Sequence, residues 1–185
     1  IQTFSKHEQK LLNQVLKKQL NTPRCSSIGR LFDCVASLLD LCQISSYEGQ
    51  AASRLEQCIK GCQLSDSYPL LWYEKNDVIR FDWQPLLENI MQDLADGIEK
   101  SVIACKFHNT LVESIVDRVN KSGLKTVVLS GGSFQNTYLT EAIIQRLSTL
   151  NVKVFWQQKV PSNDGGLALG QLLAVIQQQE FKTCV

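Results

Sequence analysis

The first third of the chain has the apolar spacing of amphipathic helices. Over residues 5–20, apolar side chains recur three or four positions apart and charged residues occupy the opposite face. The same spacing returns over residues 28–39, where Ser26 or Ser27 is available as an N-cap, and again over residues 47–62. We therefore predict three helices and no strand in this segment.

The pattern changes after Leu64. Residues 70–73 and 78–81 are short runs of β-type residues separated by four polar positions, which favours a hairpin. Helical spacing then returns over residues 86–94, which begin beside a proline, and over the long stretch 98–121, which is followed by Ser-Gly. The middle of the chain is thus expected to contain a hairpin and two helices.

The last third alternates between strand and helix. Apolar runs at residues 126–129 and 152–156 predict buried strands, and residues 139–150 between them predict a helix. Such alternation implies parallel strands with right-handed crossovers. We expect an α/β protein with one small mixed sheet of about four strands, divided into a helical segment (residues 1–66) and an α/β lobe (residues 67–185).

Two glycine-rich loops follow the two predicted parallel strands. Residues 130–136 read Ser-Gly-Gly-Ser-Phe-Gln-Asn, and residues 161–166 read Pro-Ser-Asn-Asp-Gly-Gly. A strand that turns into a helix through Gly-Gly exposes backbone N–H groups where the helix dipole favours polar or anionic ligands. Because loops after parallel strands meet at one sheet edge, we expect both to face one cleft, with Asp164 beside it.

Composition narrows the classes of function. The chain has 185 residues, 44% hydrophobic and 20% charged, with a net charge of +1, so we expect no nucleic-acid or anionic-membrane partner. No apolar run approaches the roughly 20 residues of a membrane span. The seven cysteines include no CxxC pair, which favours reduced thiols and a cytoplasmic location. No signal peptide is visible, and the absence of an initial Met leads us to expect a fragment or a processed product.

Six short motifs are together specific enough to indicate a family. In chain order, they are Gly-Arg-Leu-Phe-Asp (29–33), Ser-Tyr-Glu-Gly-Gln-Ala-Ala (46–52), Arg-Phe-Asp-Trp (80–83), Phe-His-Asn-Thr-Leu (107–111), the 130–136 loop and Asn-Asp-Gly-Gly-Leu-Ala-Leu-Gly-Gln (163–171). The set resembles the C-terminal part of the HypF carbamoyltransferases, hydrogenase maturation factors. The matching region is the second half of their Kae1-like module, a C-terminal lobe of the actin-like ATPase (ASKHA, ribonuclease H-like) architecture.

The resemblance implies a function. HypF proteins convert carbamoyl phosphate and ATP into carbamoyl-adenylate in a YrdC-like domain. The Kae1-like module then binds the adenylate beside a metal and passes the carbamoyl group to the C-terminal cysteine of HypE, where dehydration yields the cyanide ligand of nickel–iron hydrogenase. The implied cofactors are ATP or AMP and a divalent metal (Zn, Fe or Mg), and the implied partner is HypE.

The resemblance also assigns site residues. The loop that begins at Ser130 is the nucleotide-binding motif, Asp33 contacts the ribose, and a turn at residues 48–50 lines the nucleoside. Asp164 is the metal ligand. The nucleotide-binding residues so assigned are Asp33, Glu48, Gly49, Gln50, Ser130, Gly131, Gly132 and Asn136. No catalytic nucleophile is assigned, because the acceptor thiol belongs to the partner.

The chain departs from the family pattern in ways that matter. The other metal ligands of the family are paired histidines in the first half of the module, but this chain has only His7 and His108, unpaired. The first phosphate loop and the YrdC-like domain are also absent. Ser133 stands where Val is more familiar, and Asp40 where Gly is usual. We expect the metal site to be completed by the missing N-terminal half, and this chain alone to be inactive.

Several candidate residues also have purely structural interpretations. Asp33 is three positions from Arg30 and suits a salt bridge on one helix. Asp164 suits a helix N-cap, and Glu48 suits a capping box. His108 lies among apolar neighbours, which favours a packed, hydrogen-bonded residue over a base or ligand.

Other functions remain open at this stage. A Kae1-type tRNA threonylcarbamoyl transferase and an antibiotic O-carbamoyltransferase share the fold and the adenylate, although the near-zero net charge argues against a tRNA substrate. A non-catalytic lobe that only docks HypE is an alternative of a different class.

Overall fold

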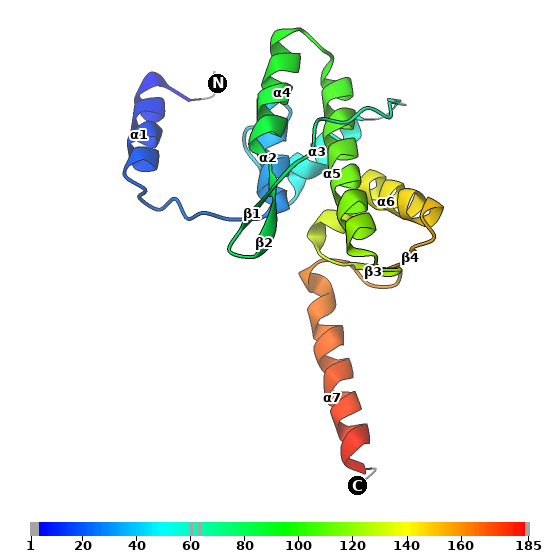
Figure 1. The fold of residues 1–185 in the computed structure, drawn as a ribbon. Helices are drawn as coiled ribbons and strands as arrows, with labels where there is room; N and C mark the ends of the chain where they lie inside the picture. The colour runs from blue at the N-terminus through cyan, green and yellow to red at the C-terminus, as the bar shows by residue number, and fades with distance from the viewer. Residues whose placement is uncertain (1–3, 60, 63, 184–185) are drawn as a thin grey trace.

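The computed structural model describes residues 4–59, 61–62 and 64–183, with side chains described as far as residue 177. Helices and strands alternate in the second half and helices dominate the first, which confirms the α/β fold class (Figure 1). The elements are α1 (Lys6–Lys17), α2 (Ile28–Leu38), α3 (Gln50–Cys58), β1 (Leu71–Lys75), β2 (Val78–Asp82), α4 (Gln84–Ala95), α5 (Lys100–Ser122), β3 (Thr126–Leu129), η1 (Gly132–Gln135), α6 (Thr137–Thr149), β4 (Lys153–Trp156), η2 (Asp164–Gly166) and α7 (Leu167–Thr183).

The three predicted N-terminal helices are present. Helix α1 begins with a capping box in which Ser5 and Glu8 satisfy each other's backbone N–H groups. None of its residues is buried, and Figure 1 shows it apart from the body of the molecule. Helix α3 begins later than predicted because Gly49 takes a φ of +79° and places the helix start at Gln50, and the helix ends at Cys58.

The predicted hairpin is also present, with a tighter turn than the sequence suggested. Strands β1 and β2 pair antiparallel, from Leu71 opposite Asp82 to Lys75 opposite Val78. Asn76 and Asp77 both take a positive φ, of 54° and 59°. Two residues of this conformation form the type I′ turn that suits the twist of a hairpin, so the strands extend further than predicted.

Strands β3 and β4 pair in parallel around α6, as expected, with Thr126 opposite Lys153. The expectation of one mixed sheet needs correction, since among the described residues the hairpin and the parallel pair form two separate two-stranded sheets. The hairpin contacts α5 through one side chain, the Arg118 guanidinium, which stands 5.2 Å from the centre of the Trp72 ring.

One hydrophobic core joins the two predicted segments. Phe32 and Leu55 from the helical segment pack with Phe107 and Ile143 from the α/β lobe, and all four side chains are buried. Phe32 and Phe107 meet edge to face with ring centroids 5.1 Å apart. The boundary at residue 66 stays a prediction, but the core crosses it.

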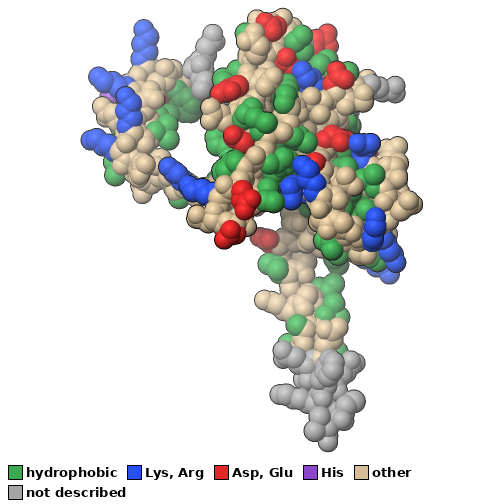
Figure 2. Space-filling view, in the orientation of Figure 1, with side chains coloured by type: hydrophobic (Ala, Val, Ile, Leu, Met, Phe, Trp, Pro, Cys, Tyr) green, Lys and Arg blue, Asp and Glu red, His purple; other side chains and the backbone are tan. Residues whose placement is uncertain are grey.

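Helix α7 projects away from this core (Figure 1). Its first three turns carry large apolar side chains that are exposed, and Figure 2 shows hydrophobic side chains along this projecting segment. They are Leu167, Leu169, Leu172, Leu173, Val175 and Ile176. No helix among the described residues is both long enough and apolar enough to cross a bilayer.

Candidate functional site

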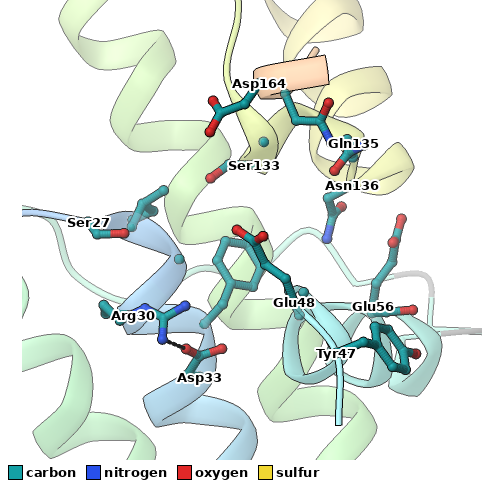
Figure 3. Close-up of a pocket in the computed structure, with 18 residues that line it drawn as sticks. Ser27, Arg30, Asp33, Tyr47, Glu48, Glu56, Ser133, Gln135, Asn136 and Asp164 are labelled. Carbon is teal, nitrogen blue, oxygen red and sulfur yellow. Dashed lines mark ion pairs between the residues drawn. The ribbon is translucent and has the colours of Figure 1, made fainter. Parts of the chain in front are cut away.

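A cavity of about 650 Å³ lies where the first and last thirds of the chain meet. Helix α2 and the start of α3 form one side, and the two glycine-rich loops form the other (Figure 3). The volume is in the range of small-molecule sites in proteins. Residues more than 100 positions apart in the sequence, such as Asp33 and Asp164, therefore share one site.

Most of the predicted nucleotide-site residues line this cavity. Those that do are Asp33, Glu48, Gly49, Gly132 and Asn136, and the predicted metal ligand Asp164 joins them. Gln50, Ser130 and Gly131 do not line it. The Gln50 side-chain oxygen instead accepts the backbone N–H of Ser46 at 2.7 Å, and the Ser130 hydroxyl accepts a hydrogen bond from Gln157 at 3.1 Å. These residues hold the loops in shape behind the cavity wall.

The two glycine-rich loops contact each other directly. The Gly131 N–H donates to the Ser162 carbonyl at 2.8 Å. Gly131 has φ +109° and ψ 158°, a conformation that is essentially restricted to glycine. A Cβ on Gly166 would lie 3.0 Å from the Pro161 carbonyl oxygen, so a side chain there would crowd the second loop. The glycines therefore serve first to bring the loops together.

The first loop offers backbone donors to the cavity. The 3-10 turn η1 begins at Gly132, and its first closing bond runs from the Phe134 N–H to the Gly131 carbonyl. The N–H groups of Gly132 and Ser133 precede that bond and so have no partner within the turn. Both residues line the cavity, which suits the approach of a polar or anionic group.

The charge of the cavity limits which part of a ligand can lie where. Four carboxylates line it, and Arg30 is the single basic residue among the described lining. The four are Asp33, Glu48, Glu56 and Asp164. Such an excess of negative charge repels a bare phosphate but suits hydroxyl donors and cations. Sugar hydroxyls thus fit the carboxylate side, and a phosphate fits only beside the backbone donors or a cation.

The purely structural interpretation holds in part for Asp33 and fails for Glu48. Asp33 does form the salt bridge to Arg30, at 2.7 Å, and its second oxygen stays available to the cavity. Glu48 does not form a capping box, since it is Gln50 that accepts the Ser46 N–H. Figure 3 shows the Glu48 carboxylate pointing into the cavity.

Asp164 is exposed at the start of η2, just before α7. The N-cap interpretation is wrong, because the Asn163 side chain caps this turn by accepting the Gly165 N–H at 3.0 Å. The Asp164 carboxylate is thus free to bind a cation. The described residues contain no group of three or more metal-binding side chains, so a single carboxylate does not make a metal site here.

Asn136 ties the cavity to the buried core. Its side-chain oxygen accepts the Leu139 N–H at 2.8 Å and so caps α6, while its nitrogen lies 3.0 Å from His108 Nε2. His108 is fully buried, and its Nδ1 lies 2.8 Å from the Ala104 carbonyl oxygen. This confirms the structural interpretation of His108. Burial lowers its pKa to about 4, although the bond to Ala104 acts in the opposite direction.

Sequence reasoning missed Glu56. This residue lines the cavity, and its carboxylate accepts the Tyr138 N–H at 3.1 Å, which joins α3 to the first turn of α6. The signal was present in the spacing, because Gly49, Ser53 and Glu56 lie four and seven positions along one helix face. Extending the Gly49 assignment along that face would have found it.

Comparison with known proteins supports the family suggested by the motifs. Residues 1–171 match the family described as "Carbamoyltransferase, Kae1-like Domain, second subdomain". The carbamoyltransferase HypF of Synechocystis sp. is 39% identical over 159 residues, which are 86% of this chain and 20% of that protein. The HypF of Rhodobacter capsulatus is 35% identical over 175 residues, 92% of this chain and 22% of that protein.

Solved structures agree with the sequence matches. A full-length HypF in the phosphate- and nucleotide-bound form superposes with a TM-score of 0.85 at 37% identity, covering 92% of this chain and 23% of that one. The HypF of T. kodakarensis gives a TM-score of 0.72 at 30% identity, covering 91% of this chain and 22% of the other. The chain therefore spans about a quarter or less of the length of these relatives.

Proposed function

The chain belongs to the HypF family of carbamoyltransferases, and we propose that its cavity binds the adenosine part of carbamoyl-adenylate, ATP or AMP. In this role the lobe positions the adenylate while the carbamoyl group passes to the C-terminal cysteine of HypE. The single observation that carries the proposal is that Asp33, Glu48 and Asn136 line one cavity of suitable volume, although they come from distant parts of the chain.

The charges support one orientation of the nucleotide. The ribose hydroxyls donate to carboxylates, for which Asp33 retains a free oxygen beside its bond to Arg30. The phosphate end lies toward the backbone donors of Gly132 and Ser133, where the carboxylate repulsion is offset. A relative solved in a phosphate- and nucleotide-bound form is consistent with this choice of ligand.

The test is calorimetric titration of the chain with AMP. Asp33→Asn removes a charged acceptor, and a hydrogen bond to a charged group contributes about 1.5–3 kcal/mol, so binding should weaken by roughly 10- to 100-fold. Asp117→Asn is the matched control, because it breaks an i, i+4 salt bridge to Lys121 at 2.9 Å on α5 but does not touch the cavity. Equal affinities for the two variants would refute the assignment.

The alternative of a scaffold lobe is an outcome of the same experiment. If the chain binds no AMP but still binds HypE with unchanged affinity for both variants, the lobe docks the partner without holding the nucleotide.

The rest of the Kae1-like module is the second partner we propose. The family description names this region a second subdomain, and the exposed apolar residues of α7 begin directly after Asp164 at the cavity rim. A first subdomain that covers α7 would lie beside Asp164 and supply the remaining metal ligands. Replacing Leu172 and Leu173 with Asp should abolish association with a separately produced first subdomain, whereas Gln171→Asp on the same helix should leave it intact. Equal association of both would refute this arrangement.

A further inference from the structure

His108 lies at the centre of the core and directly behind the cavity. Its ring is fully buried between three aromatic neighbours, with ring centroids 5.4 Å from Phe32, 5.4 Å from Phe107 and 5.7 Å from Tyr138. These edge-to-face contacts fix the plane of the imidazole. The ring therefore presents its two nitrogen atoms in fixed directions.

The two hydrogen bonds of His108 determine its tautomer. A carbonyl oxygen only accepts, so Nδ1, which lies 2.8 Å from the Ala104 carbonyl, must carry the proton. The buried ring is neutral at physiological pH, which leaves Nε2 as an acceptor. The partner at 3.0 Å from Nε2 must therefore donate, and that partner is the side-chain nitrogen of Asn136.

This chain of bonds decides which atoms Asn136 can offer to a ligand. Its oxygen accepts the Leu139 N–H at 2.8 Å and therefore faces the start of α6, and one of its two amide hydrogens is donated to His108. The second amide hydrogen has no partner among the described residues. Asn136 is 7% exposed and lines the cavity, and Figure 3 shows its nitrogen turned toward the space beside Glu48 and Glu56. The residue thus presents an N–H donor to the cavity, while its oxygen is directed toward the Leu139 N–H.

We infer that His108 is a positioning residue that makes Asn136 present an N–H donor to the ligand, so that the cavity selects a hydrogen-bond acceptor at this point. The inference rests on the proposed nucleotide site and names one determinant of its specificity. His108 orients Asn136 from within the core, because Asn136 and the aromatic rings separate the His108 ring from the cavity.

Two substitutions at His108 separate positioning from packing. His108→Gln places an acceptor oxygen near the former Nε2 and can still receive the Asn136 hydrogen bond. His108→Asn places a donor near the former Nδ1, keeps the bond to Ala104 and loses the acceptor. Both remove the aromatic ring, so a purely structural role predicts similar losses for the two variants, measured at a temperature where circular dichroism shows each to be folded.

With AMP as the probe, His108→Asn should bind about threefold to tenfold more weakly, because it loses one neutral hydrogen bond. His108→Gln should bind with an affinity near that of the unmodified chain. In an Asn136→Ala background, His108→Asn should cause no further loss of affinity, because its effect passes through Asn136. Equal losses for Gln and Asn, or an undiminished effect in that background, would overturn the inference.

A second measurement needs no ligand. Nitrogen NMR of the unmodified chain should show His108 protonated at Nδ1 and one Asn136 amide hydrogen exchanging much more slowly than the other. Protonation at Nε2 would reverse the Asn136 amide and overturn the inference. If AMP fails to bind the unmodified chain, the proposed function falls, while this spectrum still decides how Asn136 is held.

Discussion

Acid should destabilise this fold in a pH range where most proteins change little, because of His108. Its pKa is lowered from 6.5 to about 4 by burial. The unfolded chain therefore binds a proton more readily than the folded one, and stability rises with pH. The contribution is fully present above about pH 6.5 and is lost as the pH falls toward 4.

The size of the effect follows from the same two values. A difference of about 2.5 pKa units corresponds to roughly 3 kcal/mol when the titration is complete, and to about 2 kcal/mol between pH 7 and pH 5. That is a large part of the roughly 5–15 kcal/mol by which a domain of this size is stable. Most carboxylates titrate below pH 5, so they contribute little to a change in stability between pH 7 and pH 5.

The assay is urea denaturation at pH 7, 6 and 5 for the unmodified chain, for His108→Gln and for His7→Gln. His108→Gln lowers stability at every pH, but its unfolding free energy should be nearly flat between pH 7 and 5. His7 lies exposed on α1, so His7→Gln should keep the slope of the unmodified chain. Parallel pH dependences for all three proteins would refute the argument that a buried neutral imidazole causes the acid sensitivity.

Three further predictions concern packing, backbone and charge. Ile143→Ala should lower the unfolding free energy by about 2–5 kcal/mol because the side chain is fully buried, whereas Ile44→Ala, at a side chain that is 78% exposed, should change it by less than about 0.5 kcal/mol in urea titrations. Gly131→Ala should lower the unfolding free energy by about 1–3 kcal/mol and weaken AMP binding, because a φ of +109° is strained for any residue with a side chain. Gly170→Ala, inside α7, should leave stability unchanged or raise it slightly. Equal changes for the two variants in thermal melts and in calorimetric titration with AMP would contradict this prediction. Asp93→Asn removes the partly buried ion pair to Lys106 at 2.6 Å. Burial raises the pKa of Asp93, but hydrogen bonds from Lys106 and Tyr68 outweigh this and hold its pKa below the ordinary value of 3.8. The loss of stability in the variant, about 1–3 kcal/mol, should therefore be present at pH 7 and begin to shrink only as the pH falls below about 4. A difference that shrinks already between pH 7 and pH 5 would argue against the pairing.

Local patterns in the sequence were sufficient for the elements and for part of the site. The positions of the helices and strands follow from apolar spacing, and their ends follow from residues such as Ser5 and Gly123, which act on their own neighbours. The motif resemblance also assigned Asp33, Glu48 and Asn136 to one site, and all three line the cavity. Local chemistry and family pattern both operate over short stretches that a sequence displays directly.

Contacts between distant segments were decided only by the tertiary structure. The hairpin forms a sheet of its own and contacts α5 through Trp72 and Arg118, which lie far apart in the sequence, and no periodicity predicts such a pair. The atoms that Asn136 can offer to a ligand depend on His108, whose tautomer is in turn set by its contact with Ala104. Burial fixes these choices, since a polar group removed from water must find its partner among whatever atoms the fold places beside it. The sequence by itself therefore indicated several of the residues that line the cavity, and the fold determined which others join them and how their polar atoms are directed.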